Sequence, residues 1–207
     1  ALLINSEGNT IVTWEDSRNG FLNIYAQMIG DDGKTKWPTG GVPVYTAGHK
    51  NFLPTIISDG EDGAIIAWLD YRRDDRSDIY AQKINKEGLV KWPSGGVEIG
   101  RAVGWQRGPQ MVSDNAGGAI VTWDDYRSGS NANPNTYAQR VNREGTIEWT
   151  KYGVAVCPTA TRQYWSSVVS DSAGGAIITW KDNRYGNPGD IYAQHLNAAG
   201  VHSWNSN

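Results

Sequence analysis

The residues of this sequence that could do chemistry as a group are four Asp–Arg pairs, each following a tryptophan in the pattern W-x-D-x-R. The pairs are Asp16 and Arg18, Asp70 and Arg72, Asp125 and Arg127, and Asp182 and Arg184. Arginine can hold a carboxylate through two hydrogen bonds and stack on an indole, and such a pair could bind an anion, a cation or a sugar. Because a catalytic pair is needed only once, its occurrence in every repeat favours a structural latch that fixes a loop or ties neighbouring units together.

A second candidate group combines aromatic, amide and basic side chains that differ from one part of the chain to the next. Its members are His49, Asn51, Trp105, Gln106, Arg107, Gln163, Tyr164 and Trp165. Aromatic faces beside amide and guanidinium donors suit a sugar ring, a peptide or a partner surface, so we expect a ligand-binding site here. The sequence leaves open the alternative that these side chains plug the mouth of the fold or pack between its units.

Signatures of other chemistry are sparse. The chain has no nucleophile elbow, no P-loop and no histidine cluster, so the sequence predicts no catalytic residue and no metal site. The acidic pairs 31–32 and 74–75 could attract calcium, but neither matches an EF-hand loop, and we expect no cofactor. Cys157 is the single cysteine, which excludes an internal disulfide.

The charge and hydropathy of the sequence argue against two classes of partner, nucleic acids and membranes. The formal net charge is -3 and the basic residues are spread along the chain, which argues against a nucleic-acid partner. No apolar run approaches the 18 or so residues that span a bilayer, so we expect no membrane insertion.

The elements that must position these residues belong to a repeat of about 55 residues. Its first tryptophan recurs as Trp14, Trp68, Trp123 and Trp180, and a Tyr-Ala-Gln motif follows each time. The repeats cover about 1–53, 54–108, 109–165 and 166–207, and we expect them to form one domain over residues 1–207.

Each repeat contains short strand-like runs joined by glycine-containing turns, and no segment has helical periodicity. In the second repeat we predict strands at Pro54–Ser58, Ala64–Asp70, Ile79–Asn85 and Leu89–Trp92. Four-stranded units at this period are typical of propeller blades. The sequence therefore predicts an all-β propeller with four complete four-stranded antiparallel blades. We expect a closed monomer; the alternative is half of an eight-bladed ring that a homodimer completes.

Propeller geometry sorts the loops into two ends. With the strands of a blade lettered A to D from the axis outward, the A–B and C–D turns share one end and the B–C loops share the other. The A–B and C–D turns are short and similar in all repeats, whereas the B–C loops and inter-blade connections vary. Function concentrates in variable loops held by rigid elements, so we expect binding at the B–C end.

The repeat has a counterpart among known proteins. Its pattern S-D-x-x-G-G-A-I-[IV]-x-W-x-D-x-R…D-I-Y-A-Q-x-[IV]-N-x-x-G-x-x-x-W…G-V-x-V resembles β-propeller repeats of large secreted or surface-anchored bacterial proteins, over essentially the whole chain. The run Ser58-Asp59…Gly63…Trp68 has a faint similarity to the Asp-box hairpin of sialidase-like propellers. Its spacing differs and the sialidase arginine triad cannot be placed, so that activity is not carried over.

These observations lead to a functional expectation. We expect a non-enzymatic binding or scaffold module, extracellular or on the cell surface, that recognises a glycan or a protein surface at its B–C end. The alternative is a glycoside hydrolase or lyase with acidic residues at the ring mouth. A structural spacer in a surface-protein array is the second alternative.

Overall fold

The computed structural model describes residues 1–73, 75–128, 133–186 and 188–205, which form four antiparallel sheets. The first sheet has the order β1 (Leu2–Ile4), β2 (Thr10–Asp16), β3 (Asn23–Ile29) and β4 (Val42–Tyr45). The second has β5 (Asn51–Ser58), β6 (Ala64–Asp70), β7 (Asp78–Ile84) and β8 (Val97–Gly100). The third has β9 (Gln106–Ser113), β10 (Ala119–Asp125), β11 (Asn135–Val141) and β12 (Val154–Ala155). The fourth has β13 (Gln163–Ser170), β14 (Ala176–Asp182) and β15 (Asp190–Leu196).

The second strand of the second blade is apolar on both faces because that blade is sandwiched between two others. In β6 every residue is buried. Ile66 and Trp68 belong to the core shared with the first blade. Ile65 and Leu69, on the opposite face, belong to the core shared with the third blade. Alternating side chains thus build two cores from one strand.

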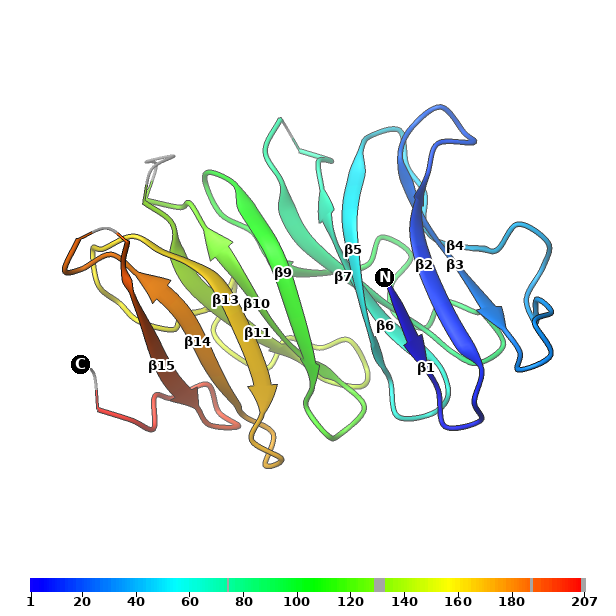
Figure 1. Cartoon of the computed structure of the whole chain (residues 1–207). Helices are drawn as coiled ribbons and strands as arrows, with labels where there is room; N and C mark the ends of the chain where they lie inside the picture. Colours follow the sequence, from blue (N-terminus) through cyan, green and yellow to red (C-terminus); the bar gives the residue numbers. More distant parts are fainter. Residues whose placement is uncertain (74, 129–132, 187, 206–207) are drawn as a thin grey trace.

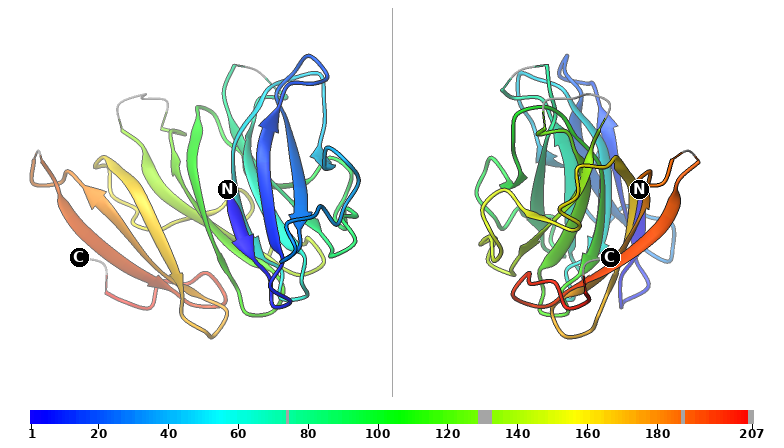
Figure 2. Two further views of the ribbon diagram at one scale, coloured as in Figure 1. Left: turned by 45° about the vertical axis from the view of Figure 1, so that its right-hand side comes forward. Right: turned by 90° about the vertical axis from the view of Figure 1, so that its left-hand side faces the viewer.

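The blades follow one another along an arc (Figures 1 and 2). The inner strand β5 packs against the first sheet, β9 packs against the second, and β13 packs against the third. No comparable packing joins the fourth sheet to the first among the described strands, and the two sheets lie at opposite ends of the arc in Figure 1. The prediction of a β-propeller with about four blades is confirmed, but the expected closed ring was wrong, because the outward faces of the two end blades do not meet.

The outermost strand of each blade was also misplaced in the sequence prediction. Residues 89–92 make only an isolated bridge, between Ile84 and Val90, and the outer strand is β8. The cause is the Gln82 amide, whose Oε1 accepts hydrogen bonds from the backbone N–H groups of Lys83 (2.9 Å) and Trp92 (2.9 Å). Its Nε2 donates to the Pro93 carbonyl at 3.0 Å. The side chain replaces the backbone partner and turns the chain away, so strand pairing resumes only at Val97.

The fourth sheet corrects the expectation of four complete blades. Its order is β13-β14-β15, and the described residues after β15 contribute only the isolated Leu196–His202 bridge. In the other three sheets the outer strand comes from a Gly-Val-x-Val or Gly-Val-x-Ile segment that follows the tryptophan at Trp37, Trp92 or Trp149. Residues 197–207 hold no such segment after Trp204.

These outer tryptophans join consecutive blades. Each donates its Nε1–H to a carbonyl in the C–D turn of the following blade: Trp37 to Lys86 (2.9 Å), Trp92 to Arg143 (3.0 Å) and Trp149 to Ala198 (3.0 Å). All three side chains are buried, whereas Trp204 is 44% exposed. The indole therefore does more than cover the rim, because it bonds one repeat to the next.

Replacing Trp92 by Phe should lower the free energy of unfolding by about 1 kcal/mol, because the Arg143 carbonyl loses its donor while most of the apolar contact remains. Trp204→Phe is the matched control, since no following blade among the described residues receives its N–H, and it should change stability little. Urea denaturation of both variants measures the difference. Equal effects would show that the inter-blade hydrogen bond carries no stability.

Candidate functional site

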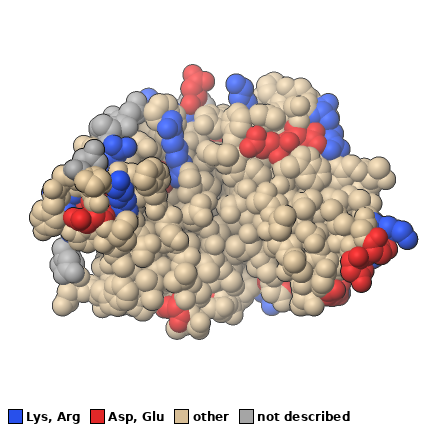
Figure 3. Space-filling model, in the orientation of Figure 1, with Lys and Arg blue, Asp and Glu red and all other residues tan. Residues whose placement is uncertain are grey.

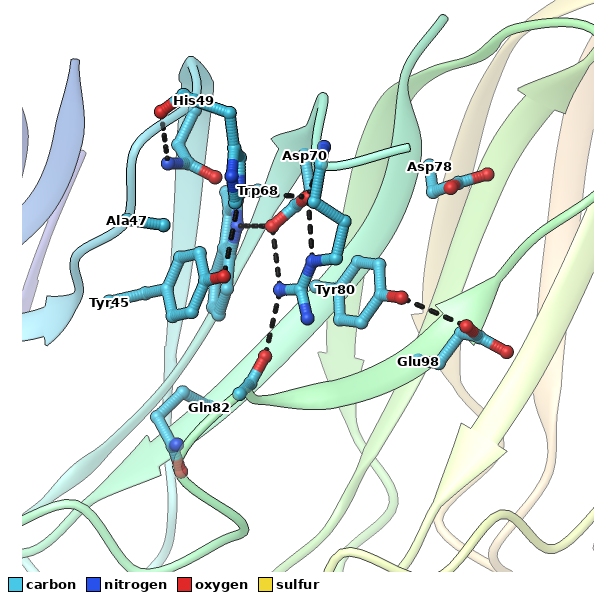
Figure 4. Close-up of polar contacts among 12 residues, drawn as sticks. Tyr45, Ala47, His49, Trp68, Asp70, Asp78, Tyr80, Gln82 and Glu98 are labelled. Carbon is cyan, nitrogen blue, oxygen red and sulfur yellow. Dashed lines mark hydrogen bonds and ion pairs between the residues drawn. The ribbon is translucent and has the colours of Figure 1, made fainter. Parts of the chain in front are cut away.

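Each W-x-D-x-R motif forms a closed set of hydrogen bonds, which Figure 4 shows for the second blade. Asp70 Oδ2 accepts from Trp68 Nε1 (3.2 Å) and Arg72 Nη2 (2.7 Å). Asp70 Oδ1 accepts from the backbone N–H and the Nε of Arg72, at 2.9 and 2.8 Å. Arg72 Nη2 also donates to the carbonyl of Gly95, just before β8, and the guanidinium lies 3.7 Å from the centre of the Tyr80 ring. The geometry suits a latch, a role that stays a prediction.

Electrostatics argues against two of these aspartates, Asp16 and Asp182, as proton donors. The hydrogen bond from the Arg18 side chain holds the pKa of Asp16 far below its usual range. Burial would raise the pKa of Asp182, but hydrogen bonds from Arg184 and Trp180 outweigh it and leave the pKa lowered. A carboxylate that stays ionised cannot deliver a proton near neutral pH. Acid catalysis therefore requires a carboxyl group other than those of Asp16 and Asp182.

The amides of the predicted binding group lie behind the surface. Asn51, Gln106 and Gln163 are fully buried. The Asn51 amide donates to carbonyls of the B–C loop and of the inter-blade connection. Gln163 Oε1 accepts from the backbone N–H of Thr136, and its Nε2 donates to the Cys157 carbonyl. The side-chain atoms of Gln106 have no hydrogen-bond partner among the described residues. These positions shape the connections between blades.

His49 lies with the latch of the second blade. Its Nε2 is 3.4 Å from Asp70 Oδ1, and its ring is 5.8 Å from that of Tyr45. Figure 4 shows it above Trp68, on the inter-blade connection. The structure therefore separates His49 and Asn51 from the aromatic residues of the third and fourth blades.

The aromatic members form two groups at the B–C end of consecutive blades. Trp105 is half-buried and meets Tyr126 edge to face at 6.4 Å, with the Arg107 guanidinium 4.2 Å from the Trp105 ring. Tyr164 is buried and supports Trp165 edge to face at 4.8 Å. The Trp165 side chain is 74% exposed, the most exposed tryptophan among the described residues. Trp165 therefore presents its indole ring to solvent and is supported by the buried Tyr164 ring.

A backbone irregularity explains this exposure. The pairing of β13 with β14 shifts register between Tyr164 and Ser167, and Trp165 takes a φ of 59°, in the left-handed region. The inner strand of the second blade does the same at Leu53, which has a φ of 52° and is 59% exposed. Non-glycine residues seldom adopt this conformation, and such outliers gather at functional sites.

Carboxylates of the preceding blade hold two of these irregular positions. Glu15 Oε1 accepts the Leu53 backbone N–H at 2.8 Å, and Asp124 Oδ2 lies 3.4 Å from the Trp165 backbone nitrogen. Both acids occupy the variable position of W-x-D, where the second blade has Leu69 and the fourth has Lys181. Sequence reasoning missed them because, within the W-x-D-x-R motif, it weighed only the residues that repeat. The available signal was period-2 alternation, which turns this position away from the Trp and Asp and toward the next blade.

Asp124 has the properties of a proton donor. Burial raises its pKa to about 6, against the opposing effects of the Trp165 and Ser166 N–H groups and the Arg162 charge. Its Oδ1 is buried and has no hydrogen-bond partner among the described residues. A carboxyl with such a pKa is substantially protonated in mildly acidic solution, as acid catalysis requires.

The surface charges and the remaining acidic residues add little to the candidate site described above. In the view of Figure 1, Figure 3 shows charged side chains around the edges of the molecule, including the upper rim where the B–C loops lie, and a largely uncharged centre. Within the described ranges, no three His, Cys, Asp or Glu side chains gather as metal ligands would. Asp74, half of one acidic pair considered for calcium, lies outside the described residues. No helix in the described part of the chain has the length and apolarity to cross a bilayer.

Comparisons with known proteins identify the fold. No protein-family model and no curated protein matches the sequence. Among solved structures, an α-L-arabinanase of Penicillium chrysogenum complexed with arabinobiose matches with a TM-score of 0.56 at 12% identity, over 98% of this chain and 64% of that chain. A mutant α-L-arabinofuranosidase of Fusarium graminearum, bound to an iminosugar inhibitor, gives 0.54 at 14%, over 94% and 59%. An endo-1,4-β-xylanase of Bacteroides thetaiotaomicron gives 0.51 at 6%, over 98% and 72%.

The comparison corrects the functional expectation. The expected non-enzymatic binding or scaffold module was wrong, because several solved structures that resemble the chain are glycoside hydrolases, which favours the hydrolase alternative. This chain spans less than two thirds of the arabinanase. At these identities the likeness shows the fold alone: the chain is an all-β propeller of the architecture found in arabinan- and xylan-degrading enzymes.

Proposed function

We propose that the chain is the blade assembly of a glycoside hydrolase, with Asp124 as its proton donor at the B–C end. The observation that carries the proposal is the half-buried Asp124 carboxyl, whose pKa is raised to about 6 and whose Oδ2 lies 3.4 Å from the backbone nitrogen of Trp165, a residue with an exposed side chain. Solved structures of the same fold that are glycoside hydrolases support this choice of chemistry. The proton that Asp124 carries would go to the glycosidic oxygen as the bond to the sugar breaks.

Glycoside hydrolysis ordinarily uses a second carboxyl group, as a base or a nucleophile. Glu15 is the candidate, because it is the acid at the position equivalent to Asp124 and it opens to the same end of the fold. It is partly exposed, and one oxygen is fixed by the Leu53 N–H.

The proposed substrate is a polysaccharide, and the two aromatic groups would provide its platforms. Trp165 offers a flat face beside the Lys181 ammonium, which lies 5.2 Å from the indole ring, while Trp105 carries the Arg107 guanidinium. Stacked sugars and hydroxyl-binding cations are a common combination in sugar sites. Arabinan and xylan are the first polymers to test, because the neighbours include an arabinanase and a xylanase. A polymeric substrate also supports an extracellular location.

The test is release of reducing ends from a panel of polysaccharides that includes arabinan and xylan. We expect the wild-type chain to hydrolyse at least one polymer, and Asp124→Asn and Glu15→Gln each to remove that activity. Asp31→Asn, at an exposed acid in a C–D turn, is the control and should leave it intact. Hydrolysis that survives both active-site substitutions would refute the assignment, and a folded wild-type chain inactive on the whole panel would refute the function.

Trp165→Ala should weaken polysaccharide binding by about 1–3 kcal/mol, the range for a well-placed aromatic anchor. The melting temperature should change little, because most of the side chain is already in water. Leu53→Ala is the matched control, since it occupies the same irregular position two blades earlier and is also exposed. Affinity electrophoresis in a gel that contains the intact polysaccharide on which the chain acts measures the difference in binding between the two variants. Equal retardation of wild-type and Trp165→Ala proteins would contradict the platform.

A further inference from the structure

A glycine occupies the irregular position of the inner strand in the third blade. Gly108 in β9 is the repeat equivalent of Leu53 in β5 and Trp165 in β13, and all three strands shift register at this point. The three residues share a left-handed backbone, with φ of 62°, 52° and 59°. The side chains of Leu53 and Trp165 are exposed, and β9 packs between the two strands that carry them (Figure 1). The middle blade thus leaves this position open.

The backbone irregularity does not explain the glycine. Glycine inside a strand marks either a bulge or a place where a ligand comes close to the backbone. The neighbouring strands form the same irregularity with leucine and tryptophan, so the bulge does not require glycine. Packing does not require it either, because a Cβ at Gly108 would meet no heavy atom within 4 Å. The close approach of a ligand is the reason that remains.

The backbone N–H at this position also differs in the third blade. In the second and fourth blades, a carboxylate of the preceding blade faces the N–H of the irregular residue. The residue equivalent to those acids before Gly108 is Leu69, whose side chain has no hydrogen-bond acceptor. The carboxylate that takes up this N–H elsewhere is therefore absent, which leaves the Gly108 donor for a hydroxyl group of a ligand.

Groups that suit a sugar lie around Gly108. The guanidinium of its neighbour Arg107 is 4.2 Å from the Trp105 ring. Arg107 is also the register partner of Asp124, so the proposed proton donor lies on the strand next to Gly108. Asp124 Oδ1 has no hydrogen-bond partner among the described residues. A flat indole, a cation and a free carboxyl oxygen beside an open glycine provide the stacking surface, donors and acceptor that a sugar unit needs.

We propose that Gly108 is a specificity-determining residue that admits one sugar unit of the polysaccharide to the position beside Asp124. The inference rests on the proposed function and assigns the residue that makes room for the sugar. The sugar lies over the bare backbone, where any side chain would take its place. The Gly108 N–H donates to one of its hydroxyl groups.

The test replaces Gly108 by leucine, the residue that the second blade has at this position. The variant should fold, because Leu53 already adopts the same backbone conformation. Its side chain would occupy the place of the sugar, so polysaccharide binding should weaken by about tenfold or more, and hydrolysis should fall with it. Affinity electrophoresis and release of reducing ends, both on the full polysaccharide panel, measure the two effects.

Gly8→Leu is the matched control. Gly8 has a φ of 82° and equally open surroundings, but it lies in an A–B turn at the opposite end of the fold. Both leucine variants carry the same kind of backbone strain, so their melting temperatures should fall by similar amounts. Only Gly108→Leu should lose binding. Gly108→Ala, which adds one methyl group, should weaken binding to a smaller extent and replaces Gly108→Leu if the leucine variant does not fold.

The outcomes separate this inference from the proposed function. If the wild-type chain binds a polysaccharide that Gly108→Leu does not, the assignment of Gly108 is supported, even where no polymer is hydrolysed and the proposed function alone is refuted. If both Gly108 variants bind and hydrolyse as well as the wild type, the assignment is overturned and the proposed function stands. A folded wild-type chain that neither binds nor hydrolyses any polymer would overturn both.

Discussion

Replacing Asp124 by asparagine should abolish hydrolysis and at the same time make the folded chain more stable at pH 7. Burial raises the pKa of Asp124 to about 6, above the value of about 3.9 in an unfolded chain. The folded state therefore holds this proton more tightly than the unfolded state. The stability it contributes is fully present below pH 4 and is lost as the pH rises to about 6.

The two pKa values set the size of the effect. At pH 7 the ionised Asp124 lowers the free energy of unfolding by at most about 3 kcal/mol, and a neutral amide removes that penalty. Loss of the proton donor should reduce kcat by about 10²–10⁴-fold. Urea denaturation at pH 7 and pH 4 checks the first part, since the gain should appear only at pH 7. A variant destabilised equally at both pH values would contradict the raised pKa.

Asp125→Asn, one residue further along β10, should have the opposite effect on stability. The Asp125 side chain is fully buried and accepts hydrogen bonds from Trp123 Nε1 and from three nitrogens of Arg127. Neutralising it leaves the partly buried guanidinium without its counter-charge, and breaking a buried pair costs about 3–5 kcal/mol. Catalysis by the remaining folded fraction should continue, because this aspartate serves the fold.

The first blade contains the matched control for that prediction. Asp16 and Arg18 make the same pair with side chains that are 12% and 41% exposed, whereas those of Asp125 and Arg127 are 0% and 27% exposed. Solvent should therefore reduce the cost of Asp16→Asn well below that of Asp125→Asn. Denaturation midpoints of the two variants measure the difference. If Asp125→Asn instead kept full stability and lost hydrolysis, the pair would belong to the chemistry.

The sequence predicted the inner architecture because that architecture depends on local patterns. Alternation placed the second strand of the second blade at Ala64–Asp70, where β6 begins and ends. The outer strand was misplaced because its position depends on the Gln82 amide, which accepts hydrogen bonds from the chain as an adjacent strand would. A side chain that substitutes for backbone pairing leaves no periodicity to detect.

The candidate site was only partly predictable, for two physical reasons. The exposure of Trp165 depends on its left-handed φ, which its residue type disfavours, so no propensity argument indicates it. Asp124 depends on contact with the inner strand of the next blade, about 40 residues later in the chain. The sequence did place Trp105 and Trp165 at the correct end of the fold, because propeller topology alone determines which loops share an end.

The hydrogen bonds of the outer tryptophans all run in the same direction along the chain, from one blade to the blade that follows it. Trp37, Trp92 and Trp149 each bond to the blade that follows them, so each of the first three blades is fastened on its C-terminal side. Opening of the fourth blade releases the Trp149 indole, which loosens the third blade in turn. In an array stabilised by nearest-neighbour interfaces, each of these three hydrogen bonds therefore couples the stability of one blade to that of the next.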